Sequence, residues 1–198
     1  MMGKGSVSHN MRTFSAKNVD KERSKYNMEF CHLDIKKVYH ELFDDALERY
    51  NAKQKRSDRK IDNYYEKIRQ SKQEKLFHEV ILQIGNKDDT NAKSEEGQLA
   101  KNILIEFMED FQKRNPNLYV FSAHLYMDEE TPHVHIDFVP FIRNSNRGLD
   151  TRVSLKVRWQ SRDLKAAQEA QRSGINGWSL KNRNFQRLRK DTVCGGNS

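Results

Sequence analysis

The sequence predicts an α+β protein in which helices pack on one face of an antiparallel sheet. Two long stretches carry apolar residues at helical spacing, and a dense apolar run of strand character lies between them. Two further apolar segments are separated by only a short polar turn, which is typical of an antiparallel hairpin. Antiparallel sheets commonly leave one face open, so the helices are expected on the other face.

The first elements follow from apolar periodicity. Residues 26–33 alternate weakly and predict a short strand. A long helix should begin at Ile35 with Asp34 as its N-cap, because the next apolar residues recur at spacings of three and four: Val38, Tyr39, Leu42, Phe43, Ala46, Leu47 and Tyr50.

The middle of the chain predicts a helix, a strand and a second long helix. A basic linker at 53–60 leads into a short helix that contains Tyr64 and Ile68 and is started by Asp58 or Asp62. Residues 76–84 form a dense apolar run and predict a buried strand. A helix over 95–114 should end before Asn115-Pro116, because the residue before proline disfavours the helical conformation.

The hairpin comes next, with strands at 118–127 and 132–142 around the polar turn 128–131. A polar helix is expected at 161–172, and the remaining tail has no clear pattern. Alternation places Ser122, His124 and Tyr126 on one face of the first strand, and a separate apolar set on the other: Tyr119, Phe121, Ala123, Leu125 and Met127.

The return strand directs His133, His135 and Asp137 to one side. If Met127 faces Pro132 across the turn, Tyr126 lies opposite His133 and His124 lies opposite His135. Three imidazoles would then gather on the open face. Three neutral imidazoles can bind a divalent metal and leave positions for a substrate oxygen, so that the metal acts as a Lewis acid. The alternative is that these are packed or solvated histidines.

The balance of charge favours a polyanionic partner. The 198 residues include 36 Lys and Arg against 28 Asp and Glu, a net charge of +8. Nucleic acid is the leading partner, because each neutralised phosphate releases counterions. The apolar runs are too short for a membrane span, and Cys31 and Cys194 are too few for a disulfide framework, so a cytoplasmic protein is expected.

Two motifs resemble one family. The hairpin residues Asp128 to His135 match the pattern D-E-x-T-P-H-x-H of the MobV-type (Mob/Pre) plasmid mobilisation relaxases. Near the start, His9-Asn10-Met11-Arg12 is similar to the H-N-x-R signature of these relaxases, and Asn18, Arg23 and Asn27 follow in a like context. The resemblance implies an HUH-like palm fold.

The resemblance also implies an activity. Such enzymes nick one DNA strand at a plasmid origin of transfer and remain covalently attached to its 5′ end. The nucleophile carries over to His9, with Arg12 offsetting phosphate charge and Glu129 acting on the metal or on His9. A Mn²⁺- or Mg²⁺-type metal would be held by His124, His133 and His135, with Asp137 able to orient one of these rings. The implied partner is plasmid origin DNA, single-stranded or extruded as a hairpin.

One position departs from the family pattern. The family histidine two places before Asp128 is Tyr126 here, and the nearest histidine is His124. Either His124 is the third ligand, or the metal uses His133, His135 and an acidic side chain. Tyr126 is itself an alternative nucleophile, since relaxases of other types use tyrosine, although a packing role is the simpler interpretation.

The DNA-binding candidates combine basic and stacking residues: Arg12, Arg23, Asn27, Lys55, Arg56, Arg59 and Tyr126. A second basic run lies at 183–190. Two rival functions stay open. One is a non-catalytic module that binds origin or promoter DNA, and the other is a metallohydrolase acting on a small phosphate ester.

The resemblance defines the expected domains. It covers about residues 3–155, so the nicking domain is assigned to 1–155. Residues 156–198 form an atypical basic segment, and a truncated or frameshifted gene is expected, because the family usually continues into a helical region that dimerises the full-length form.

Overall fold

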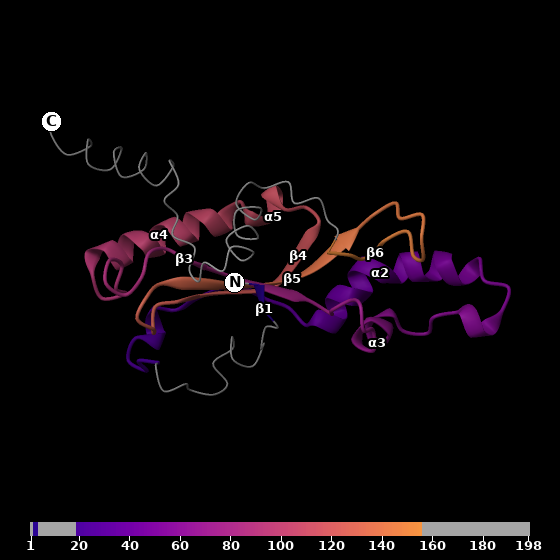
Figure 1. Ribbon diagram of the computed structural model, residues 1–198, viewed down its shortest axis with the longest axis horizontal. Helices are drawn as coiled ribbons and strands as arrows, with labels where there is room; N and C mark the ends of the chain where they lie inside the picture. The colour runs from indigo at the N-terminus through magenta and orange to yellow at the C-terminus, as the bar shows by residue number, and fades with distance from the viewer. Residues whose placement is uncertain (1, 4–18, 156–198) are drawn as a thin grey trace.

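The sheet of this protein is antiparallel, and the α+β class is confirmed (Figure 1). The computed structural model describes residues 2–3 and 19–155. The strand order is β1-β3-β5-β4-β2, with β6 paired to β5. The strands are β1 Met2–Gly3, β2 Met28–His32, β3 His78–Gln83, β4 Leu118–Tyr126, β5 His133–Ile142 and β6 Arg152–Val153.

The helices begin where capping residues satisfy their first backbone N–H groups. Helix α2 (Ile35–Ala52) is capped by Asp34, as predicted, which accepts from the backbone N–H groups of Lys36 and Lys37. Helix α3 (Tyr64–Arg69) is capped by Asn63. The predicted caps Asp58 and Asp62 were therefore wrong. Two 3₁₀ turns complete this part, η1 (Ser24–Tyr26) and η2 (Ser57–Arg59).

The predicted helix over 95–114 is two helices. Helix α4 (Glu95–Glu109) ends at Asp110, whose backbone leaves the helical region at φ −105° and ψ 2°, and α5 (Phe111–Arg114) follows. The apolar periodicity continues through the break because Phe111 is still buried in the core beside α4. The predicted polar helix at 161–172 lies outside the described residues.

Two apolar cores lie on opposite faces of the sheet. Helices α4 and α5 pack over one face, where Leu104 and Phe111 meet Val134, Ile136 and Phe138 of β5. Helices α2 and α3 pack at one end of the other face. There a separate cluster joins the helices to strand residues: Val38, Tyr39, Phe43, Ile68, Phe121, Val139 and Phe141. The second face is thus covered by helices at one end only among the described residues.

A bulge in β4 lies between the part of the strand that packs under α2 and the part that carries His124. The register shifts between Val120, which pairs with Phe138, and Ser122, which pairs with Asp137. This extra residue reverses the alternation of the strand. Tyr119 and Phe121 therefore join the α2 cluster instead of sharing a face with Leu125, as strict alternation predicted.

The predicted hairpin register is confirmed. His124 pairs with His135, and Tyr126 pairs with His133. Directly paired residues share a face, so the polar side chains of the hairpin gather on the half of the second face that lies beyond α2. In the described part of the chain, no helix combines the length and apolar composition that a membrane span requires.

Candidate functional site

The hairpin brings four aromatic rings together at the turn end of the sheet. The ring centroids of His133 and His135 are 5.2 Å apart. The ring of Tyr126 lies 5.4 Å from that of His133, 5.2 Å from that of His135 and 6.3 Å from that of His124. All four residues are at least nine-tenths buried, so the cluster has little contact with water.

Two of the histidines have their orientation fixed through Nδ1. Nδ1 of His133 lies 2.8 Å from the carbonyl oxygen of Thr131, and Nδ1 of His135 lies 2.7 Å from Oε1 of Glu79. A carbonyl and an ionised carboxylate only accept, so the ring proton is assigned to Nδ1 in both cases. In each neutral ring the lone pair then lies on Nε2, the usual arrangement of a histidine that binds a metal.

His124 has a different environment. Its Nε2 is buried and has no hydrogen-bond partner, while its Nδ1 lies 3.9 Å from Oε2 of Glu29. Burial lowers the pKa of His124 from its ordinary value, and Glu29 only partly opposes that effect. The neutral ring is therefore favoured. On its other side, the ring lies 6.1 Å from that of His32.

Metal binding at this cluster can be tested against the donors present. An unpartnered buried imidazole nitrogen is costly, and a cation would satisfy Nε2 of His124. Imidazole and carboxylate donors together suit Mn²⁺, so the donor set fits such a group. Within residues 2–3 and 19–155, however, no group of three His, Cys, Asp or Glu side chains is already arranged to hold a metal ion.

Tyr126 occupies the position where the relaxase pattern has a histidine. Its ring contacts all three imidazoles, and only 2% of the residue is exposed. The ring therefore packs inside the cluster. Its predicted roles in DNA contact or as an alternative nucleophile remain predictions.

The acidic residues of the site come from the hairpin turn and from several strands. Glu129, predicted from the motif, is half-buried, with Oε2 4.0 Å from Nε2 of His133. The sequence analysis did not identify Glu79, whose carboxylate contacts His135. It assigned the orientation of a ligand imidazole to Asp137 instead. The available signal was a lone carboxylate inside the apolar run 76–84, since buried charges are rare unless paired.

A buried carboxylate fastens an earlier segment to the hairpin turn. Oδ2 of Asp128 accepts from the side chains of Ser24 (3.0 Å) and Asn27 (2.7 Å), and Oδ1 of Asn27 accepts from the backbone N–H of Met127 at 2.7 Å. Asp20 N–H also donates to the backbone carbonyl of Asp128. The predicted DNA contact Asn27 thus holds residues 20–27 against the turn.

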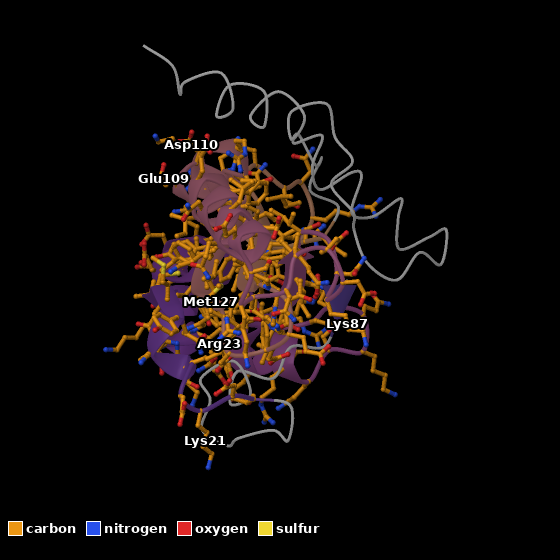
Figure 2. The ribbon with its side chains drawn as sticks, turned by 90° about the vertical axis from the view of Figure 1, so that its left-hand side faces the viewer. Lys21, Arg23, Lys87, Glu109, Asp110 and Met127 are labelled. Carbon is orange, nitrogen blue, oxygen red and sulfur yellow. The ribbon has the colours of Figure 1, made fainter. Side chains whose placement is uncertain are left out.

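Arg23 supports the same segment. Its Nη2 donates to the carbonyl oxygen of Ala92 at 2.6 Å, which joins residues 20–27 to the loop before α4. Figure 2 shows Arg23 and Met127 close together on the side of the molecule that faces the viewer, with Lys21 below them. The DNA-binding role of Arg23 remains a prediction.

His9 and Arg12 lie outside the described residues, and Gly3 and Asp20 are described on either side of them. Gly3 of β1 pairs with Glu79, whose carboxylate contacts His135. At the other end, Asp20 is bonded to Asp128. The described residues on either side of positions 4–18 therefore bond to residues beside the histidine cluster.

Three other predicted DNA contacts lie elsewhere. Lys55, Arg56 and Arg59 belong to the loop between α2 and α3, at the end of the molecule opposite the hairpin turn (Figure 1). Arg56 also forms an exposed ion pair with Asp58. The structure does not bring these residues to the histidine cluster.

Known proteins resemble this chain in sequence and in structure. The model of the plasmid recombination enzyme family (Mob_Pre) matches residues 9–184. No curated protein matches the sequence. Three solved structures show the MobM relaxase domain with Mn and oriT DNA of plasmid pMV158. One is 25% identical, covers 91% of this chain and 88% of its own, and has a TM-score of 0.44. The others are 24% identical, with TM-scores of 0.47 and 0.46, and cover 92% and 95% of this chain and 89% and 96% of their own.

Proposed function

The chain belongs to the Mob_Pre family of plasmid recombination enzymes, and from this premise we propose that it nicks one strand of plasmid origin DNA with His9 as nucleophile. The observation that carries the proposal is that Gly3 and Asp20, which lie on either side of positions 4–18 in the chain, bond to Glu79 and Asp128 beside the histidine cluster. Six residues of extended chain from Gly3 to His9 span at most about 20 Å. This chain length is compatible with a His9 that acts at the hairpin.

The proposed reaction is a transesterification. A neutral His9 nitrogen attacks the phosphorus and forms a P–N bond, while the P–O3′ bond breaks and the leaving 3′ oxygen takes up a proton. The 5′ end remains on the protein. Arg12, three residues after His9, offsets the charge that develops on the phosphate oxygens.

The histidine cluster is the proposed metal centre. His133 and His135 would contribute Nε2, because their Nδ1 atoms are bonded to Thr131 and Glu79, and His124 would contribute its unpartnered Nε2. Glu129 lies next to His133 and would add an oxygen donor or orient His9. We favour Mn²⁺, since Mg²⁺ prefers all-oxygen ligands. When bound, the ion supplies Lewis-acid stabilisation of the phosphate.

A second candidate function is a non-catalytic module that binds the same DNA. The observation that favours it is the buried Tyr126, whose ring packs against all three imidazoles within a described region that has no ready-made metal group. Such a protein would retain origin binding and lack cleavage.

One experiment separates these functions. Supercoiled plasmid carrying a candidate origin is incubated with the protein and Mn²⁺, then denatured and examined for relaxed DNA with covalently bound protein. We expect the adduct with the wild-type chain and none with His9→Ala. DNA binding without any adduct would instead support the second candidate.

The matched control is His40→Ala, which removes an exposed histidine on α2 outside the cluster. This variant should form the adduct as the wild type does. An adduct that persists in His9→Ala would move the nucleophile elsewhere, and Tyr126→Phe would then be tested.

A further inference from the structure

Tyr26 is an exposed aromatic residue fastened to the hairpin turn. It is 51% exposed, more than any other large hydrophobic side chain in the described part of the chain. It closes the 3₁₀ turn η1, and its neighbour Asn27 bonds to both Met127 and Asp128. The ring is thus displayed to solvent on a segment whose backbone is held in place.

A hollow lies beside Tyr26. Its volume is about 550 Å³, which lies within the range of about 300 to 1,000 Å³ that is usual for ligand sites. Tyr26, Met127, Ala92 and Gln98 line it together with Arg23 and Lys93. The walls therefore combine an aromatic ring, apolar surface, two cations and the carboxylates of Asp20 and Glu22, at the end of the hairpin that carries the histidine cluster.

One cation lies over the Tyr26 ring, and another lines the hollow. Nζ of Lys25 lies 5.1 Å from the centroid of the Tyr26 ring. Lys93 is exposed and pairs only loosely with Asp20, at 3.5 Å, so its ammonium group can exchange this partner for a phosphate. Glu22 also lines the hollow, and it would oppose a polyanion placed deep inside. The favoured arrangement places a base in the hollow and the neighbouring phosphates of the strand beside Lys25 and Lys93.

We propose that Tyr26 and this hollow form a base-stacking subsite for single-stranded DNA. The inference rests on the proposed function, which brings a DNA strand to the histidine cluster at the same end of the hairpin. Tyr26 stacks on one unpaired base without reading its identity, and Lys25 and Lys93 contact the neighbouring phosphates. The subsite contributes affinity and fixes the path of the strand over the end of the hairpin.

The test is a binding titration with fluorescence anisotropy, using oligo(dT) of about 16 nucleotides, the upper range for one single-strand-binding module. Tyr26→Ala should weaken binding about 5- to 150-fold, as loss of one stacked base does. Tyr26→Phe keeps the ring and should keep the affinity. Lys25→Ala and Lys93→Ala should each reduce the salt dependence of log K by up to about 0.7.

Two controls test whether lost stacking causes the weaker binding of Tyr26→Ala to oligo(dT). Leu33→Ala removes another exposed apolar side chain, 45% exposed and outside the hollow, and should leave binding unchanged. A duplex of the same length should bind the wild type and Tyr26→Ala equally, because its bases are already stacked.

The two proposals fail in different ways. Equal affinity of the wild type and Tyr26→Ala for oligo(dT) overturns the stacking subsite, as does equal weakening by Tyr26→Phe. Failure of the nicking function appears separately, as the absence of a covalent adduct between the wild-type chain and origin plasmid.

Discussion

Two halves of one sheet face differ in what covers them. On β5, Val139 and Phe141 lie beneath α2 and α3 in an apolar cluster. On the same face of the same strand, His133, His135 and Asp137 lie beyond the helices. Both halves are buried, so burial does not distinguish them. The difference is that hydrocarbon covers the first half, while the second half carries polar side chains, of which His133 bonds to the Thr131 carbonyl and His135 to Glu79.

What covers a strand decides which side chains the strand can carry. A helix that packs on a strand requires apolar side chains, because an unpaired polar group buried there costs free energy. At the hairpin end, Glu79 and the Thr131 carbonyl provide the partners that the buried imidazoles need. The polar half is therefore suited to bind a ligand, and the apolar half to provide stability.

The largest expected effect belongs to the apolar half. Phe43 of α2 is 0% exposed and packs in the cluster with Phe121 and Val139. Phe43→Ala should lower the free energy of unfolding by about 3–5 kcal/mol, because it removes apolar contacts and leaves a cavity. Urea denaturation measures this loss. A loss well below this range would mean that the α2 cluster contributes little to stability.

The next effect belongs to the polar half. Glu79→Gln replaces the carboxylate that fixes His135, and it should weaken Mn²⁺ binding about 10- to 100-fold, the usual result of losing a partner of a ligating histidine. Isothermal titration of metal-depleted protein measures the affinity.

The control is Glu41→Gln in the apolar half, where Oε2 of Glu41 accepts from the Tyr119 hydroxyl. This change also removes a carboxylate from a hydrogen bond, yet it should leave Mn²⁺ affinity unchanged. Equal weakening by both variants would contradict the division of the face.

The smallest effect concerns a histidine outside the cluster. His78 stacks on Phe138, which faces the α4 core, with ring centroids 6.2 Å apart. Burial, with a smaller effect of Lys75, lowers the pKa of His78 from 6.5 to about 4. Between these values the unfolded chain binds a proton that the folded chain does not. Stability is therefore fully present above pH 6.5 and falls as the pH drops towards 4.

The slope from His78 should be at most about 1.4 kcal/mol per pH unit. Urea denaturation at several pH values between these limits measures it, and His78→Gln should remove this part of the pH dependence. An unchanged slope in the variant would assign the acid sensitivity to other groups.

Much of this architecture could be predicted from the sequence. The α2 cap at Asp34 and the pairings of His124 with His135 and Tyr126 with His133 follow from periodicity and from the length of the turn. Both depend on local patterns, which a single sequence displays directly.

Features set by contacts between distant residues could not be predicted. The β4 bulge at Val120 and Ser122 has no local signature, so the face of Phe121 was assigned incorrectly. Glu79 meets His135 only because β3 pairs with β5. The bonds from Ser24 and Asn27 to Asp128 join segments that are about a hundred positions apart along the chain.

The bulge also limits how β4 can vary in length. Loops on either side of the strand can gain or lose residues without changing which way its side chains point, but the strand itself cannot. Removing the additional residue near Phe121 would restore strict alternation, and one half of the strand would then have to turn over. Either the imidazole of His124 would be directed into hydrocarbon beneath α4, or the phenol of Tyr119 would leave its place under α2. A single additional residue thus keeps the histidine cluster and the packing under α2 compatible along one strand.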